Sequence, residues 1–206
     1  MKGNLIIICS PSGGGKGTLI KEIRRTVPGL GYSVSYTTRQ MREGEQNGRE
    51  YFFVSRPEFE KRASSGDLLE YFEVHGNLYG TSVSMIDEIT ATGSDVILEI
   101  DVQGAEAVKR KKPDSVGIFI LPPSFEVLRE RLIARSTEHS ESLALRLSNA
   151  FGEIEHSPRF DYVVINREIG QAAAELASII IAERMRPDRQ MDEIKGILDS
   201  FDRSKL

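Results

Sequence analysis

Short apolar runs alternate with helix-like patterns along most of this chain. The runs at 5–9, 95–100, 116–121 and 162–165 have the length and composition of buried strands. Between them, apolar residues recur at helical spacing, and Pro or Gly ends several of the predicted helices. This alternation predicts an α/β core, in which a parallel sheet is covered by helices on both faces.

Two segments interrupt the alternation. Residues 33–82 are rich in strand patterns and are predicted to form an insertion, with strands at 32–36 and 51–54, a helix from Pro57 to about Gly66, and a hairpin of 68–74 with 78–79. After Pro122 and Pro123, two arginine-rich helices are predicted at about 124–135 and 140–155. We therefore interpret residues 1–206 as one unit with a core (1–32, 83–121 and 156–206), an insertion (33–82) and a helical segment (122–155).

The C-terminal pattern predicts two long helices, at about 169–185 and 188–202. In the second helix, one face is apolar, formed by Met191, Ile194, Ile197, Leu198 and Phe201. We expect this face to pack on the core or on a partner subunit, which leaves a homo-oligomer open.

Composition narrows the class of protein. The net charge of −4 gives no general attraction to nucleic acid or to acidic membranes, and we expect neither as a partner. The single cysteine, Cys9, excludes a disulfide within the chain, which suits a cytoplasmic protein. The apolar run at 5–9 is too short for a secretory signal, and no segment has the length of a membrane span. The basic run at 109–112 is interpreted as a solvated helix end, with a nucleic-acid patch as the alternative.

A glycine-rich stretch, Ser10 to Thr18, follows the first predicted strand and begins the first predicted helix. Strand, glycine-rich loop, lysine and helix form the arrangement of a phosphate-binding loop, in which backbone N–H groups and Lys16 surround an anion. The match to the usual pattern is imperfect, because Ser10 replaces the first glycine and Gly17 replaces the metal-binding hydroxyl residue. The alternative is a glycine-rich turn with a surface lysine.

Further charged residues fall into three groups. Arg39 and Arg42, with Tyr51 and Tyr79, could bind a phosphate dianion, or the arginines could pair with nearby glutamates. Glu99 and Asp101 follow an apolar strand, where carboxylates commonly hold Mg²⁺, although Asp101 could instead cap the next helix. The arginines of the helical segment could close over transferring phosphates or lie exposed near glutamates; they are Arg129, Arg131, Arg135 and Arg146. His75, His139 and His156 lack the spacing of metal ligands.

Five sequence motifs in order resemble those of the guanylate kinase family. They are SVSYTTRQMREGE at 33–45, NGREYFF at 47–53, LLEYFEVHGNLYGTS at 68–82, LEIDVQGA at 98–105 and FILPPS at 119–124. The resemblance runs from Leu5 to about Met185. It implies transfer of the γ-phosphate of ATP to GMP, and also to dGMP, with Mg²⁺. It also implies a phosphate-loop core, a mixed-sheet GMP domain at 33–82 and a helical lid at 122–155, and a place in purine metabolism.

The resemblance also implies roles for matching residues. The GMP phosphate is bound by Arg39, Arg42, Tyr51 and Tyr79, and guanine is read by Ser35, Glu70 and Thr81, with Gly80 and Asp101 also on the GMP side. ATP is bound by Ser12, Gly13, Gly14, Gly15, Lys16, Gly17, Thr18 and Asn166. Charge on the transferred phosphoryl is stabilised by Lys16, Arg42, Arg131, Arg135 and Arg146. Mg²⁺ is held mainly through water by Thr18, Glu99 and Asp101.

Some positions depart from the family pattern. Gly17 stands directly after the loop lysine, Glu99 replaces the usual Asp, Met41 replaces a proline, and Arg167 replaces an acid after Asn166. Two other functions therefore stay open: a phosphopeptide-binding module that has lost catalysis, and a kinase for ribose 1,5-bisphosphate.

Overall fold

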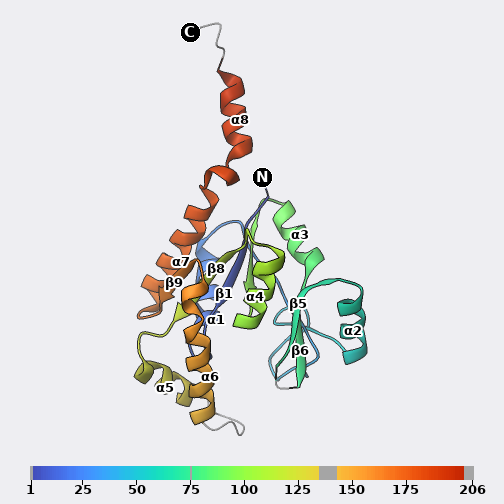
Figure 1. Cartoon of the computed structure of the whole chain (residues 1–206), viewed down its shortest axis with the longest axis vertical. Coiled ribbons are helices and arrows are strands. Elements are labelled where there is room, and N and C mark those ends of the chain that lie inside the picture. The colour runs from blue at the N-terminus through green and yellow to red at the C-terminus, as the bar shows by residue number, and fades with distance from the viewer. Residues whose placement is uncertain (1, 75, 135–142, 202–206) are drawn as a thin grey trace.

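The chain folds around a five-stranded parallel sheet (Figure 1). The computed structural model describes residues 2–74, 76–134 and 143–201. Neighbouring strands are parallel throughout the order β2–β7–β1–β8–β9. These strands are β1 (Leu5–Cys9), β2 (Leu30–Tyr32), β7 (Asp95–Glu99), β8 (Val116–Leu121) and β9 (Tyr162–Ile165). The predicted parallel α/β core is confirmed.

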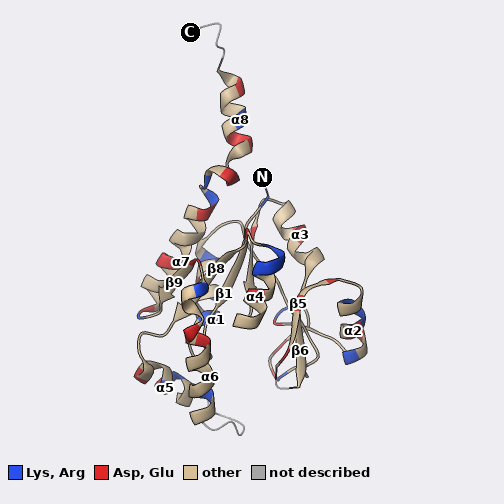
Figure 2. Ribbon diagram, viewed as in Figure 1, with Lys and Arg blue, Asp and Glu red and all other residues tan. Residues whose placement is uncertain are grey.

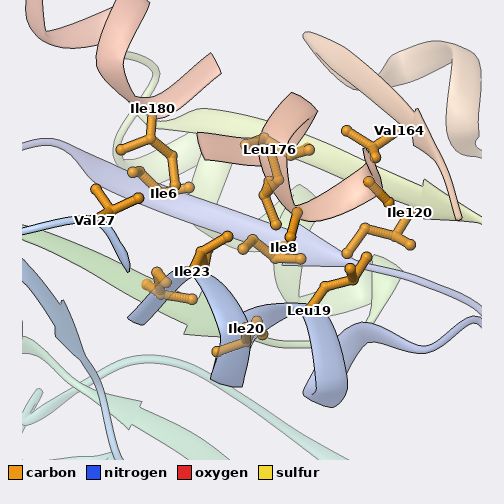
Figure 3. Packing of buried hydrophobic residues seen from close by; sticks show 14 of the residues in the cluster. Ile6, Ile8, Leu19, Ile20, Ile23, Val27, Ile120, Val164, Leu176 and Ile180 are labelled. Carbon is orange, nitrogen blue, oxygen red and sulfur yellow. The ribbon is translucent and has the colours of Figure 1, made fainter. Parts of the chain in front are cut away.

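Helices cover both faces of this sheet because successive side chains of a strand point to opposite faces. Ile6 and Ile8 of β1 pack with α1 (Lys16–Thr26) and α7 (Ile169–Arg184), as Figure 3 shows. On the other face, Ile7 and Cys9 pack with residues of α3 (Val83–Ala91) and α4 (Val102–Lys111). These four side chains of β1 are fully buried. The core therefore has the three expected layers.

A second, four-stranded sheet has the order β4–β3–β6–β5. β3 runs parallel to β4 and antiparallel to β6, so the sheet is mixed, as expected. Its elements are β3 (Tyr36–Thr37), β4 (Phe52–Phe53), α2 (Arg56–Ser64), β5 (Leu68–Val74) and β6 (Asn77–Ser82). All of them lie within the segment 33–82, whose limits as a domain stay a prediction.

The prediction of one strand at 32–36 is wrong. β2 ends at Tyr32 in the parallel sheet, and β3 begins at Tyr36 in the mixed sheet. The N–H of Ser33 donates to the carbonyl of Ile97 at 3.0 Å, whereas the carbonyl of Ser35 accepts from Phe52 at 2.9 Å. The chain therefore crosses between the sheets here, and the alternating pattern spans the crossing because both strands contribute to it.

Two helices, α5 (Phe125–Ala134) and α6 (Leu143–Glu155), follow β8. They pack on one another through a small cluster that includes Leu128, Leu132 and Ala150. This cluster is separate from the two that cover the parallel sheet. A short 3-10 turn, η1 (Ser157–Arg159), then leads into β9.

The last helix, α8 (Met191–Ser200), extends away from the sheets after the 3-10 turn η2 (Pro187–Arg189) (Figure 1). Its main contact is with η2, and Met191, Ile197, Leu198 and Phe201 are 57–65% exposed. The prediction that its apolar face packs on the core is wrong, because η2 directs the helix outward. The alternative, a partner subunit, stays a prediction.

Charges of both signs are spread along the helices, with a basic last turn of α4 at Lys109, Arg110 and Lys111 (Figure 2). Those cations lie at the negative end of the helix dipole, but the interpretation as a solvated end is only partly correct. Arg110 is exposed, whereas Lys109 pairs with Asp161 at 2.6 Å and Lys111 donates to the carbonyl of Leu69. Within the described part of the chain, no helix combines the length and the hydropathy needed to cross a membrane.

Candidate active site

The glycine-rich loop joins β1 to α1 at the carboxyl edge of the parallel sheet. Gly13 and Gly15 have φ angles of +86° and +92°, a conformation that favours glycine. A Cβ atom on Gly15 would lie 2.2 Å from Nδ2 of Asn166, so any other residue there would clash with Asn166. The loop therefore brings its N–H groups to the N-terminus of α1, where an anion is favoured.

Lys16 is the first residue of α1, and its ammonium points to the end of β7. Nζ donates to the carbonyl of Ile100 at 3.2 Å and lies 4.0 Å from Oε1 of Glu99. The hydroxyl of Tyr32 donates to Oε2 of the same carboxylate at 3.1 Å. Lys16 and Glu99 thus form a partly buried pair next to the phosphate loop.

Asp101 caps α4, since its Oδ1 accepts from the N–H of Gly104 at 2.7 Å. The capping interpretation is therefore correct for one oxygen of this carboxylate. Among the described residues, no group of three or more His, Cys, Asp and Glu side chains is arranged to hold a metal ion. Any cation at Glu99 and Asp101 would need further oxygen ligands from substrate phosphates and water, as Mg²⁺ commonly takes.

A cleft of about 300 Å³ lies between the phosphate loop and the mixed sheet. Its lining brings together eight of the residues predicted for the site: Lys16, Ser35, Tyr51, Glu70, Tyr79, Gly80, Glu99 and Asp101. A cavity of about 360 Å³ lies at the amino ends of β8 and β9, far from the loop along the sheet. We assign the site to the smaller cleft because the residues predicted for the site line it; volume is not the criterion.

Glu70 is the buried carboxylate of this cleft, with 5% of the residue exposed. It lies opposite Thr81 in the pairing of β5 with β6, and the Thr81 hydroxyl donates to Oε1 at 2.5 Å. Burial raises the pKa of Glu70 to about 7; the negative charge of Asp101 adds to the rise, and the Thr81 bond opposes it. Such a carboxylate is poised to accept hydrogen bonds from a ligand that replaces water.

Arg39 is held beside the cleft by contacts on two sides. Its Nη2 donates to both carboxylate oxygens of Glu45, at 2.8 and 3.0 Å. Its guanidinium also lies 5.4 Å from the ring centre of Tyr51 and 5.5 Å from that of Phe53. This bond to Arg39 lowers the pKa of the Glu45 carboxyl. The ion pair with a glutamate is therefore present, and it orients Arg39 toward the aromatic wall of the cleft.

Other predicted site residues lie outside the lining. Arg42 is exposed, and its backbone N–H donates to Glu45 at 2.8 Å. Ser12, Gly17 and Thr18 are exposed on the loop and on the first turn of α1. Arg135 lies outside the described residues.

Asn166 and Arg131 both contact the backbone of the phosphate loop. Nδ2 of Asn166 donates to the carbonyl of Gly14 at 3.0 Å, and only 2% of Asn166 is exposed. Arg131 donates to the carbonyl of Asn166 at 3.2 Å and to that of Gly14 at 3.5 Å. These contacts support the loop, and the prediction that Asn166 binds ATP stays a prediction.

Sequence reasoning missed several residues of the site. Phe72, Val74 and Ile100 line the cleft, and alternating polarity along residues 68–74 could have indicated the first two. Tyr32 and Glu153 also reach the site, Tyr32 through Glu99 and Glu153 through the N–H of Ser12. No local pattern marks either residue, because their partners are far away in the sequence.

Comparison with known proteins gives consistent matches over nearly the whole chain. The family model described as guanylate kinase matches residues 2–183. The chain is 47% identical to the guanylate kinase of Symbiobacterium thermophilum, over 91% of this chain and 89% of that protein. It is 48% identical to that of Neisseria gonorrhoeae, over 97% of each chain. The crystal structure of guanylate kinase from Anaplasma phagocytophilum aligns with a TM-score of 0.75 at 34% identity, covering 91% of this chain and 89% of that one.

Proposed function

Because the chain belongs to the guanylate kinase family, we propose that the cleft between phosphate loop and mixed sheet is where it phosphorylates GMP with ATP. One observation carries the placement: Glu70, a buried carboxylate paired with Thr81, lines the same cleft as Lys16 of the phosphate loop. The acceptor base is held on the mixed sheet, and the phosphates of both substrates meet at the end of β7.

Guanine is read by Glu70, Thr81 and Ser35. Guanine offers two donors side by side, N1–H and the 2-amino group, and the ionised Glu70 carboxylate accepts from both. The hydroxyl group of Ser35 can donate to O6, and the Thr81 hydroxyl, which donates its one proton to Glu70, orients the carboxylate that reads the base. Adenine has no donor at N1 or C2 and presents a donor at C6, so it would leave buried groups unpaired.

The GMP phosphate is bound by Arg39, Tyr51 and Tyr79, with Arg42 entering from the exposed loop. The rings of Tyr51 and Tyr79 pack edge to face with centres 5.7 Å apart, which places both hydroxyl-bearing rings on one wall. Charge-assisted bonds from guanidinium and hydroxyl groups suit a phosphate dianion. Gly80 lies between the base readers and the phosphate binders, and its Cβ would lie 2.9 Å from side-chain atoms of Leu68 and Phe59, so packing behind the cleft requires glycine there.

The ATP phosphates bind on the loop from Ser12 to Thr18, with Lys16 reaching the transferred phosphoryl. Phosphoryl transfer depends on alignment and on compensation of negative charge. Arg131 and Arg146 supply positive charge from α5 and α6, and Arg135 belongs to the same set by its place in the sequence. Asn166 supports the loop through Gly14.

Mg²⁺ fits the donors that remain. Glu99 and Asp101 present carboxylate oxygens at the end of β7, and Thr18 presents a hydroxyl on α1. Bound there, the cation would neutralise charge on the phosphates. We place the reaction in purine nucleotide metabolism, where its product is GDP.

An assay that couples ADP release to a spectroscopic signal tests the function. We expect turnover of GMP and dGMP, with AMP and UMP at least about a hundredfold worse in kcat/KM. Equal rates with AMP would overturn the guanine-reading assignment. Lack of turnover, with binding of a phosphopeptide in the cleft, would support the non-catalytic module instead, and turnover of ribose 1,5-bisphosphate would support the sugar kinase.

A further inference from the structure

Glu153 is a carboxylate of the cleft that has no role in the scheme above. It lies on α6, is half-buried, and shares the cleft with Lys16 and Asp101. Its Oε2 accepts a hydrogen bond from the backbone N–H of Ser12 at 3.2 Å. Burial raises the pKa of Glu153, while the Ser12 bond and the charge of Lys16 act in the opposite direction.

The Ser12 N–H belongs to the loop that is proposed to receive the ATP phosphates. A carboxylate and a phosphate are both anionic, and both accept hydrogen bonds from the N–H groups of such a loop. The two groups would also repel one another at this short range. A phosphate bound at Ser12 and the carboxylate of Glu153 therefore compete for the same donor.

The bond also connects two parts of the molecule. α6 packs on α5 through its own small cluster, which includes Ala150. Glu153 lies seven residues after Arg146, which is two helical turns, so the two side chains share a face of α6. Displacement of Glu153 from the loop would remove this link between the loop and the face of α6 that carries Arg146.

We propose that Glu153 is a positioning residue that holds α6 on the phosphate loop until an ATP phosphate displaces it. The proposal rests on the use of this loop for ATP. It links α6 to the nucleotide through Glu153, beside the contacts that Arg131 of α5 makes with Gly14 and Asn166, and it makes nucleotide binding weaker than the loop alone would allow.

The variant Glu153→Gln tests this by removing the charge while keeping the shape of the side chain. In calorimetric titrations with ADP and Mg²⁺, we expect roughly threefold to tenfold tighter binding than in the wild type, because a Gln amide accepts from the Ser12 N–H more weakly than a carboxylate and does not repel the phosphate. In the kinase assay, KM for ATP should fall with it, while KM for GMP stays within about twofold. The matched control is Glu155→Gln, which makes the same charge change at an exposed position of α6 and should leave ADP affinity unchanged.

Unchanged or weaker ADP binding in Glu153→Gln would overturn the proposal, as would an equal gain in Glu155→Gln. Glu153→Ala, which preserves helix propensity, repeats the test should the Gln variant not fold, and the same gain is expected. The titration with ADP does not require GMP, the phosphate acceptor. A protein that binds ADP without phosphorylating GMP would therefore refute the proposed function and still leave the role of Glu153 decided by the titration.

Discussion

Replacing Glu70 by Gln probes the base-reading site and a buried charge together. Burial raises the pKa of Glu70 from its ordinary value of 4.5 to about 7 in the folded protein. The folded state therefore binds the proton more tightly than the unfolded chain, so the wild type loses stability as pH rises from 4.5 to about 7. At pH 8 the full difference amounts to at most about 3 kcal/mol. Glu70→Gln carries no charge to bury and should be more stable than the wild type at this pH.

The same change should weaken GMP binding. A Gln side chain offers one acceptor and one donor where guanine presents two donors. Losing one hydrogen bond to a charged group costs about 1.5–3 kcal/mol, which corresponds to a rise of roughly 10–150-fold in KM for GMP. KM for ATP should stay within about twofold, because the ATP phosphates bind on the other side of the cleft.

The pH dependence of the affinity for GMP is a further test of the role of Glu70. Bound GMP favours the ionised carboxylate, so the affinity of the wild type for GMP should rise with pH up to about 7 and level off above it. The phosphate of GMP titrates near pH 6 as well, with a pKa of about 6. Because that titration is common to both proteins, the ratio of wild-type to Glu70→Gln affinity isolates the contribution of Glu70.

The assay combines thermal unfolding at pH 8 with steady-state kinetics from pH 5.5 to 8.5, taken in steps of about half a unit. Glu73→Gln is the matched control, since Glu73 lies on the same strand with 53% of its side chain exposed. It should change stability by less than about 0.5 kcal/mol and leave KM for GMP unchanged. If Glu70→Gln kept KM for GMP within about twofold of the wild type, the assignment of Glu70 to the base would be refuted.

Four further substitutions test other features of the structure. Gly104→Ala should raise KM for GMP without a gain in stability, because its Cβ would lie 3.2 Å from Cβ of Ile100, 3.3 Å from Oδ1 of Asp101 and 3.4 Å from Oε2 of Glu70. Gly152→Ala, in open space on α6, should gain about 0.5–1 kcal/mol in thermal unfolding. Gly17→Ser, with nothing within 4 Å of its Cβ, should fold normally and lower the Mg²⁺ concentration for half-maximal rate; an unchanged Mg²⁺ profile would contradict a role for a hydroxyl there. Ile197→Lys, at a position 57% exposed, should change Tm by less than about 2 °C. A loss of Tm that grows with protein concentration, together with a change of mass in light scattering, would reveal a partner subunit.

The fold could be predicted wherever local pattern and tertiary environment agree. β8 and β9 have the predicted bounds, because short apolar runs become strands of the core sheet; β8 is buried on both faces, whereas β9 is an edge strand with Val163 45% exposed. The crossing at residues 33–35 was missed because alternation indicates an extended chain without indicating which sheet it joins. The apolar face of α8 shows the same limit, since amphipathic spacing indicates that a helix has one apolar side and not what covers it.

The residues of the site also fall into those that the sequence could predict and those that it could not. Residues that approach the substrates are recognised by type and spacing, and eight of them line one cleft. The contacts that hold such residues in place join distant parts of the chain: Tyr32 to Glu99 across 67 positions, and Glu153 to Ser12 across 141. A tyrosine, or a glutamate within a helix, has no local feature that reveals such a partner. Because these contacts fix where Lys16 and the loop lie, and phosphoryl transfer depends on alignment, they should govern the rate as much as the recognised residues do.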